Sequence, residues 1–363
     1  MALNYIILFF TYFPYAVFAL TMATFVLRLR LGIRGKAIWA MVLLACCSKF
    51  LCFRELGGHA FTPELPAAVI WAWNWAYSGA MILSVLSLVC FFRFCGRGIV
   101  LPVTAWLLAA WGIFNGIVPP EVKKLELRFE GLPPELDGYR IVQISDLHAS
   151  SAARAWRTRK VVDLANSLSP DLICMTGDYA DGRAEVVHEE LAPIADLRAR
   201  DGIWAVTGNH EHFQPRADWL PWFDRWGVRF LSNDCVFPRR GLALGGVDDF
   251  HAEWHGGRRP DVDKAFSSAT NGEFRILLQH QPRNAHANIE GRGVRLQLSG
   301  HTHGGIMPGF RPIVRNHNGG FVRGLYEFPR GILYVNSGCG QWPGFPIRFF
   351  TPSEVTLFVL RRK

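Results

Sequence analysis

The sequence has few charged residues and no cysteine framework. Charged side chains make up 19% of the 363 residues, against about 25% in an average soluble domain. None of the eight cysteines stands in a CxxC pair, and five of them lie in or beside apolar runs. We therefore expect neither a disulfide scaffold nor a thiolate zinc site. The N-terminus also lacks the basic stretch and small-residue cleavage site of a signal peptide, so we expect it to remain as an anchor.

The chain is rich in apolar sequence, and this is concentrated before residue 120. Four runs, at about 3–27, 37–53, 67–92 and 98–118, each approach the roughly 20 residues that a helix needs to cross a bilayer. Only Lys49 is clearly charged within them. So few charges favour membrane spans over the alternative, a set of buried core helices. We predict four transmembrane α-helices over residues 1–120.

Basic residues in the loops predict how these helices are oriented. The loop after the first run holds Arg28, Arg30, Arg34 and Lys36, and the loop after the third holds Arg93 and Arg97, whereas the middle loop offers only Arg54. Lys and Arg concentrate in cytoplasmic loops. Four crossings would then place everything after Pro120 outside the cytoplasm of a bacterial plasma membrane. Much of the net charge of +9 lies in these loops, so we do not expect a nucleic-acid partner.

After residue 120 the pattern changes to apolar strands alternating with helix-like stretches. Strand patterns such as "YRIVQISD", "DLICMTGD" and "GIWAVTGN" are separated by amphipathic segments at 154–168, 184–199 and 216–226. Continuous apolar strands between helices are typical of a layered α/β domain with buried sheets. We predict one such domain over residues 121–363.

Most of these strands are followed by a residue able to bind a metal ion. The candidates stand in the motifs SDLH, GDYAD, GNHEH, LQHQP and GHTHGG, and they are Asp146, His148, Asp178, Asn209, His280, His301 and His303. Strands of such a sheet present their carboxyl ends at one crevice, so these side chains should converge. Oxygen and imidazole ligands without sulfur favour divalent Mn, Fe, Zn or Co. Seven ligands are too many for one four-coordinate ion and suit a pair bridged by a carboxylate.

The same motifs, in this order, resemble those of the calcineurin-like metallophosphoesterase superfamily over about residues 138–360. The tail "GLYEFPRGILYVNSGCGQWPGFPIRFF" is similar to that of the bacterial branch with the YkuE and YaeI type phosphodiesterases. This resemblance implies a four-layer α/β/β/α sandwich and phosphoester hydrolysis by a metal-activated hydroxide. Ile306 stands where the branch often has Gln, and Ser150 stands where it often has Gly. These two differences affect the expected contacts with substrate more than the expected metal ligands.

The resemblance also implies a role for each motif residue. Asp146, His148 and His303 would hold one ion, Asn209, His280 and His301 the other, and Asp178 would bridge them. His210 would contact the phosphate and protonate the leaving group, which suits an imidazole. His212, His251, His255 and Arg154 are candidate substrate contacts. We expect Asp181, Asp248 and Asp249 to be turn or supporting residues rather than ligands, and His188, His286 and His317 to be structural.

The substrate is a hypothesis drawn from the membrane tether. Only residues 119–123 separate the last apolar run from the first strand, a reach on the order of 20 Å. The basic-aromatic stretches 154–160 and 219–226 are of a kind that rests on anionic headgroups, although ordinary helix packing is the alternative. We expect a phospholipid or lipid-linked phosphate substrate. Two alternatives stay open: a cytoplasm-facing pyrophosphatase of the UDP-2,3-diacylglucosamine type, and a sensor or scaffold whose metal domain binds without turnover.

Overall fold

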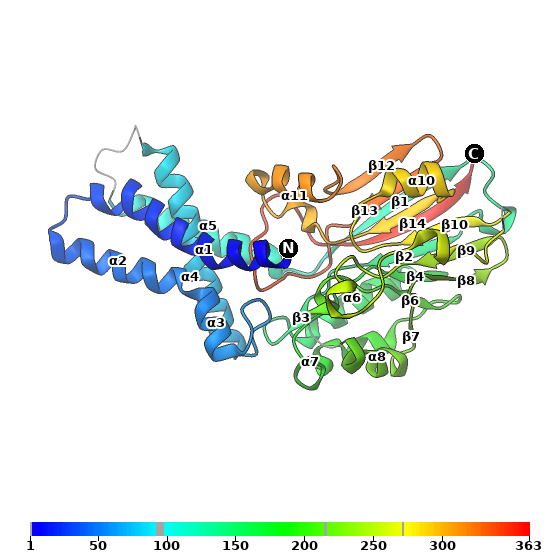
Figure 1. Ribbon diagram of the computed structural model, residues 1–363, viewed down its shortest axis with the longest axis horizontal. Coiled ribbons are helices and arrows are strands. Elements are labelled where there is room, and N and C mark those ends of the chain that lie inside the picture. Colours follow the sequence, from blue (N-terminus) through cyan, green and yellow to red (C-terminus); the bar gives the residue numbers. More distant parts are fainter. Residues whose placement is uncertain (1, 92–97, 214–215, 271) are drawn as a thin grey trace. The chain divides into compact units, whose positions relative to one another are not determined.

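A computed structural model describes residues 2–91, 98–213, 216–270 and 272–363 (Figure 1). The chain divides into two compact units. The first, the helical unit, comprises residues 1–117 and the segment Trp342–Ile347; the second, the α/β unit, comprises Val118–Gln341 and Arg348–Lys363. The predicted boundary at residue 120 lies three residues beyond the first unit, and no sequence pattern indicates that residues 342–347 group with the helices.

The described part of the helical unit contains two helices long and apolar enough to cross a membrane, or three if one bent pair counts as a span. The two are α4 (Ala67–Val89) and α5 (Val100–Ile117), close to the predicted runs. The remaining elements are α1 (Ala2–Thr24), η1 (Val26–Arg28), α2 (Ile33–Cys47) and α3 (Lys49–Gly57).

The prediction of four transmembrane helices is therefore wrong as stated. The run predicted at 37–53 is broken at Ser48, where α2 and α3 meet at a bend of 52°. The Ser48 hydroxyl donates to the carbonyl of Ala45 at 2.7 Å, a local bond that competes with continuation of the helix. In α1, the described apolar stretch, Tyr12–Arg28, is shorter than a span requires. Arg93 and Arg97, used to predict orientation, lie outside the described residues.

The α/β unit contains two six-stranded sheets and a short two-stranded one. The first sheet has the order β1 (Glu121–Phe129), β14 (Glu354–Arg362), β2 (Arg140–Ile144), β4 (Leu172–Met175), β6 (Ile203–Ala205) and β7 (Val228–Phe230). The second has the order β12 (Gly324–Phe328), β13 (Gly331–Val335), β11 (Leu296–Ser299), β10 (Phe274–Leu278), β9 (Leu242–Gly246) and β8 (Asp234–Arg239). Strands β3 (Ala149–Ser150) and β5 (Ala180–Asp181) form the third.

Each large sheet is built around a parallel centre. Strands β2, β4, β6 and β7 are parallel neighbours, and so are β9, β10, β11 and β13. Their residues are almost all buried, which explains the continuous apolar runs in the sequence. Strand β14 runs antiparallel to β2 and parallel to β1, so β1 and β14 end at the opposite edge from β2.

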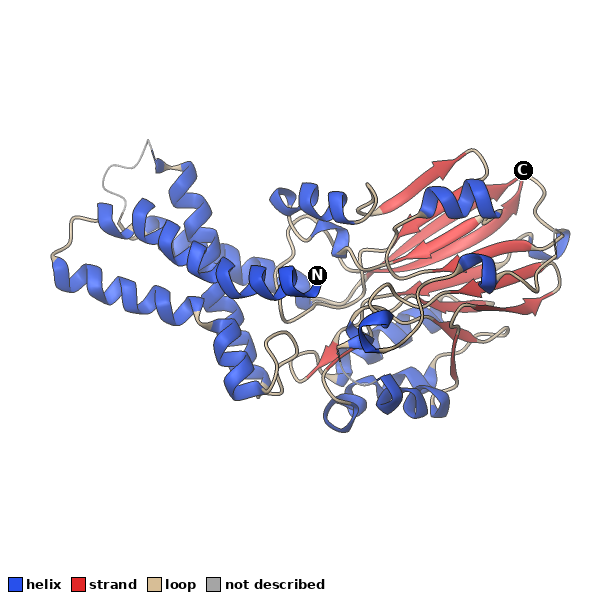
Figure 2. Ribbon diagram, viewed as in Figure 1, coloured by secondary structure: helices blue, strands red, loops and turns tan. Residues whose placement is uncertain are grey.

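Among the described residues, three hydrophobic clusters pack these layers together. Figure 2 shows the strands of the sheets with helices beside them. One cluster lies between the sheets and includes Ile141, Leu298 and Phe358. A second packs the first sheet against α6 (Ala155–Ser167), α7 (Ala184–Leu191) and α8 (Arg216–Arg225). The third packs the second sheet against α9 (Val262–Ala265) and α10 (Ala285–Arg292). The predicted two-sheet α/β fold is confirmed.

The aromatic residues of α8 belong to this core. Trp219 is 3% exposed and Phe223 is 1% exposed, and both pack in the cluster beneath the first sheet. Trp222 and Trp226 are partly buried against the same cluster. Ordinary helix packing thus accounts for Trp219 and Phe223, and contact of this stretch with lipid headgroups stays a prediction. The remaining short helices are η3 (Pro134–Leu136), η4 (Ala192–Asp196), η5 (His210–His212), η6 (Ala252–His255), η7 (His303–Gly305), η8 (Pro308–Phe310) and α11 (Arg311–His317).

Candidate metal centre

The seven predicted ligands follow the carboxyl ends of neighbouring parallel strands. Strands β2, β4 and β6 lie side by side in the first sheet and lead to Asp146, Asp178 and Asn209. Strands β10 and β11 are neighbours in the second sheet and lead to His280 and His301. Because parallel strands end at the same edge, the topology gathers side chains far apart in the sequence.

One group of donor atoms consists of Asp146, His148 and His303. The Nε2 atoms of the two histidines lie 3.0 Å apart, and Nε2 of His303 lies 3.7 Å from Oδ1 of Asp146. His148 and Asp146 are fully buried, and His303 is 8% exposed. Ring nitrogens that face one another at this distance, beside a carboxylate, suit a common cation.

A second group consists of Asp178, His280 and His301, with Asn209 beside them. Nε2 of His280 lies 3.1 Å from Oδ2 of Asp178, 3.2 Å from Nδ1 of His301 and 3.2 Å from Oδ1 of Asn209. Oδ2 of Asp178 is also 3.9 Å from Nε2 of His148 in the first group. This carboxylate thus lies between two sets of oxygen and imidazole donors, and the residues fit a pair of divalent ions.

The backbone around these donors is strained. Five of the seven ligand candidates adopt left-handed φ values, and they are Asp146 (52°), His148 (49°), Asp178 (57°), His301 (72°) and His303 (45°). This conformation is uncommon outside glycine and persists where the surroundings impose it, most often at functional sites. A Cβ on Gly208 would lie 2.2 Å from Oδ1 of Asp178, and one on Gly300 would lie 2.4 Å from Oδ2 of Asp146. The motifs need these glycines so that the backbone can approach the ligands.

Outer partners orient the histidines. Nδ1 of His280 donates to the carbonyl of Thr176 at 2.6 Å, which leaves the Nε2 lone pair for the site. Nδ1 of His148 lies 3.0 Å from Oδ2 of Asp181. Nδ1 of His303 lies 2.9 Å from a guanidinium nitrogen of the buried Arg348. Burial, followed by the charges of His148 and Arg348, lowers the pKa of His303 well below its usual value.

His210 stands beside both groups. Its Nδ1 donates to Oδ1 of Asp181 at 2.5 Å, and its Nε2 lies 3.9 Å from Oδ2 of Asp178. Burial lowers the pKa of His210, but the carboxylates of Asp178 and Asp181 outweigh it and raise the pKa to about 9. Without cations, this imidazole is therefore protonated at neutral pH. Asp181 is fully enclosed and lies beside two histidines at once. Its carboxylate, His148 and His210 also form a third group of candidate donor atoms, so its role as a supporting residue stays a prediction.

Sequence reasoning missed two buried residues next to the site. Glu211 accepts hydrogen bonds from the backbone N–H groups of Asp178 (2.8 Å), Tyr179 (2.7 Å) and Gly208 (2.7 Å). Its place within GNHEH, directly after His210, was the available signal. Arg348 also bonds Gln341, Ser337 and Gly340. No local pattern marks it, because the ligand candidate that it contacts, His303, lies 45 residues away in the sequence.

The candidate substrate contacts lie in varied surroundings. His212 is buried, with Nε2 3.1 Å from the hydroxyl of Thr207. His251 is paired with Asp249 at 2.8 Å. The exposed guanidinium of Arg154 lies 3.3 Å from Glu190. The side chain of His255 is outside the described residues. None of these contacts tests binding of a substrate, so these roles stay predictions.

Comparison with known proteins places the chain in a family. Residues 139–305 match the family model described as calcineurin-like phosphoesterase. An uncharacterized metallophosphoesterase of Helicobacter pylori is 32% identical over 253 residues, covering 69% of this chain and 67% of the relative. The uncharacterized metallophosphoesterase YkuE of Bacillus subtilis is 30% identical over 240 residues, covering 63% of this chain and 82% of YkuE. The chain belongs to the calcineurin-like phosphoesterase family, and it is a metal-dependent phosphoesterase with His and Asp metal-binding sites.

Another relative joins the same domain to a membrane region. The Danio rerio "transmembrane protein with metallophosphoesterase domain" is 33% identical over 269 residues, covering 70% of this chain and 61% of the relative. Among solved structures, the Thermus thermophilus sulfate thiohydrolase SoxB aligns with a TM-score of 0.40 and 13% identity, covering 63% of this chain and 57% of SoxB. That likeness is too loose to support an argument about function.

Proposed function

We propose that this protein is a membrane-anchored di-metal phosphoesterase that hydrolyses a phosphate ester or pyrophosphate of a lipid-linked or envelope substrate. The observation that carries the chemistry is the position of Asp178, whose Oδ2 lies between His148 at 3.9 Å and His280 at 3.1 Å. Asp146, His148 and His303 would hold one ion, and Asn209, His280 and His301 the other, with Asp178 as the bridge. When bound, the two ions would activate water and offset the charge of the phosphate.

The chain's own residues supply the rest of the reaction. Nδ1 of His210 gives its hydrogen bond to Asp181, which holds the ring with Nε2 toward the space beside Asp178. A protonated Nε2 can donate to the oxygen that leaves phosphorus. Asp181 holds His148 in the same way, so one carboxylate fixes both a ligand and the proton donor. No serine or cysteine nucleophile is needed.

The proposed chemistry is tested with purified full-length protein and Mn²⁺. We expect the wild type to hydrolyse bis-p-nitrophenyl phosphate, and we expect the His210→Ala variant to lose more activity on an alkyl phosphodiester than on this substrate. Inactivity of the wild type and the variant alike, with Mn, Fe, Zn and Co each supplied, would favour the alternative of another class, a metal-domain sensor or scaffold. The complete donor set supports an enzyme, because a protein that only binds needs no proton donor beside its metal ligands.

We further propose that the α/β unit lies outside the cytoplasm. The basic loop between α1 and α2, with Arg28, Arg30, Arg34 and Lys36, supports this orientation. It requires that the bent α2–α3 pair crosses the bilayer as α4 and α5 would, which makes three crossings after this loop. A pair that re-enters instead would leave the unit in the cytoplasm, where a pyrophosphatase of the UDP-2,3-diacylglucosamine type is the alternative. Alkaline phosphatase and green fluorescent protein fused to the C-terminus distinguish the two, since the first is active only outside the cytoplasm and the second fluoresces only inside.

A further inference from the structure

A second pair of aspartate and histidine lies in the α/β unit, in addition to Asp181 with His210. Asp249 is 2% exposed, and Nδ1 of His251 lies 2.8 Å from its Oδ1 atom. The backbone N–H of His251 donates to the same oxygen at 2.9 Å. Trp254 packs against the imidazole, with ring centroids 4.0 Å apart and an interplanar angle of 82°. These contacts orient the ring of His251, and Nε2 has no hydrogen-bond partner among the described residues.

This Asp249–His251 pair is tied to the second group of ligand candidates. Gln281 directly follows the ligand candidate His280, and its Nε2 atom lies 3.0 Å from each carboxylate oxygen of Asp249. Burial raises the pKa of Asp249, but the hydrogen bond from His251 and the charge of His280 outweigh it and lower the pKa. Burial and the charge of His280 lower the pKa of His301, and both members of the pair contribute to that pKa as well. The pair therefore lies within electrostatic reach of the second group.

A partly buried arginine completes this side of the centre. The guanidinium of Arg283 lies over the ring of Phe250, 5.5 Å from its centroid, and Phe250 stands between Asp249 and His251 in the sequence. Within the part of the chain that the structure describes, Nε of Arg283 is buried without a hydrogen-bond partner and the guanidinium forms no salt bridge. Burial lowers the pKa of Arg283, and the charge of Asp249 opposes this shift. A guanidinium carries five N–H donors, so Arg283 can bind an anionic group.

The two aspartate–histidine pairs lie beside different donor groups. His210, bonded to Asp181, packs against His148 of the first group, with ring centroids 4.6 Å apart. The proposed proton donor to the leaving oxygen is thus already in place there. Donors beside the second group are then available to the rest of the substrate, which is the part that stays bonded to phosphorus after the leaving group departs.

We propose that Arg283 and His251 form a subsite for a second phosphate of the substrate, carried by the group that stays bonded to the reacting phosphorus. This inference rests on the proposed function and narrows its substrate class to phosphodiesters with a further phosphate on the retained group. The fork of a guanidinium matches two oxygens of a phosphate, and such charged hydrogen bonds are strong. When His251 is protonated, its Nε2 adds a further donor. The carboxylate of Asp249 does not exclude an anion, because His251 and Gln281 already compensate it.

The test compares two diesters that differ only in this phosphate. One is propyl p-nitrophenyl phosphate, and the other is the same ester with a phosphate on the terminal carbon of the propyl group. Both release p-nitrophenol, so the leaving group is constant. With full-length protein and Mn²⁺, we expect kcat/KM to be about 10- to 100-fold higher for the second ester, mainly through a lower KM, as hydrogen bonds to a charged group would give. Equal kcat/KM values for the two esters would overturn the inference.

Variants show whether Arg283 and His251 cause this preference. Arg283→Gln should remove most of it, Arg283→Lys should keep part of it because the charge remains without the fork, and His251→Phe should lower it in part. The matched control is Arg330→Gln, at a side chain 70% exposed, which should keep the full preference. Each variant is described by the ratio of kcat/KM for the two esters on one preparation, so a fraction of unfolded protein does not alter the result.

The outcomes separate this inference from the proposed function. A preference that survives in Arg283→Gln, or that falls equally in Arg330→Gln, would contradict the subsite. A wild type that hydrolyses neither ester with any of the four metals would instead contradict the proposed function.

Discussion

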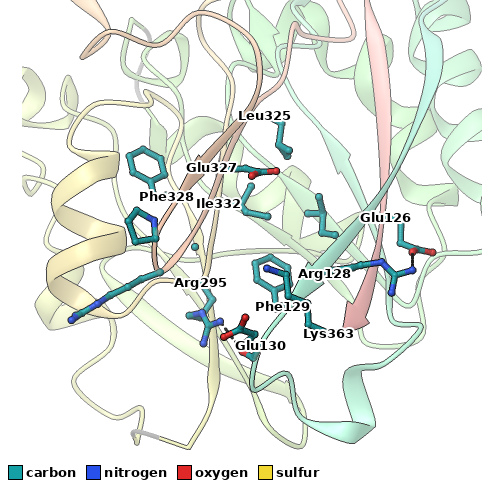
Figure 3. A pocket seen from close by; sticks show the side chains of 14 residues that line it. Glu126, Arg128, Phe129, Glu130, Arg295, Leu325, Glu327, Phe328, Ile332 and Lys363 are labelled. Atoms are coloured by element: carbon teal, nitrogen blue, oxygen red, sulfur yellow. Dashed lines mark hydrogen bonds and ion pairs between the residues drawn. The ribbon is translucent and has the colours of Figure 1, made fainter.

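The two ends of the paired sheets use charged residues in opposite ways. At the carboxyl ends of the parallel strands, Asp146 and His148 are fully buried and face other polar side chains. At the other end, a groove of about 350 Å³ is lined by charged residues such as Arg128, Glu130 and Arg330 (Figure 3). The side chain of Arg128 is 59% exposed and pairs with Glu126 on the same strand, as the dashed line in Figure 3 marks.

Burial explains the difference. Charges in water interact weakly because water screens them, so exposed pairs such as Arg128 with Glu126 contribute little to stability. Buried carboxylates and imidazoles carry a large desolvation cost, which is acceptable only where partners or cations compensate it. The buried polar cluster, with its large desolvation cost, is therefore the feature that identifies the site. Substitutions in this cluster should change activity and stability far more than substitutions at the exposed end.

The largest effect is expected from Asp178→Asn, because it removes the carboxylate between the two donor groups. Metal content, measured by elemental analysis of protein saturated with Mn²⁺, should fall below two ions per chain. Turnover of bis-p-nitrophenyl phosphate should drop by more than the roughly 10²- to 10⁴-fold that loss of a general acid costs. Unchanged turnover with two ions bound would remove the basis for a bridged pair.

The next effect is expected from His210→Ala, which removes the proton donor but no proposed ligand. Turnover should fall by about 10²- to 10⁴-fold, and the loss should be larger for an alkyl ester than for a nitrophenyl ester, whose leaving group needs no proton. Metal content should stay at two. An equal loss on both esters would mean that His210 does not act as an acid.

Asp181→Asn should have a smaller effect, because Asp181 acts through His148 and His210. A loss of about 10- to 100-fold in turnover or metal affinity is expected when an outer partner of this kind is removed. A positioning role also predicts that the pH profile of turnover shifts to lower pH, since a carboxylate that raises the pKa of His210 is gone. A reduced rate with an unshifted profile would indicate a structural role only.

Glu211→Gln tests the support of the ligand loops. The substitution replaces a carboxylate that accepts three backbone N–H groups with an amide that has one acceptor oxygen. The free energy of unfolding, measured by chemical denaturation, should fall by about 1–3 kcal/mol. Arg330→Gln at the opposite end is the control and should change stability by no more than about 0.5 kcal/mol. A similar loss of unfolding free energy in both variants would show that substitutions at the two ends do not differ in effect.

The smallest effect is a pH dependence of the metal-free protein. The carboxylates of Asp178 and Asp181 overcome burial and raise the pKa of His210 from 6.5 to about 9. A raised pKa stabilises the fold fully below the unfolded pKa of about 6.5, and the contribution is lost as pH rises through about 9. Thermal unfolding is measured with a chelator present. The difference in melting temperature between the wild type and the His210→Gln variant should become smaller as the pH rises from 6 to 9.5. A difference in melting temperature that does not change with pH would contradict this coupling.

The contrast also shows which parts were predictable. The strands around the ligands were readable because buried parallel strands are continuously apolar and each ends in a polar motif residue. The candidate spans at 67–92 and 98–118 were readable from length and hydropathy. The bend between α2 and α3 was not, because the apolar run continues through Ser48 without a proline or glycine to mark it. The aromatic stretch at 219–226 left two interpretations open, because composition does not say which face of a helix meets the core.

By itself, the sequence determined the chemical class of this protein, because the motif residues and their order specify the ligand types whatever their distances. Only the tertiary structure decided how those residues meet. It placed Asp178 between the two donor groups and Asp181 in contact with both His148 and His210. It also placed Arg348 beside His303. It also joined Phe349 to the loop that carries the ligands, through a hydrogen bond to Ile306. These relations depend on which strands lie side by side and where loops close, and contacts between distant segments leave no mark in a local pattern.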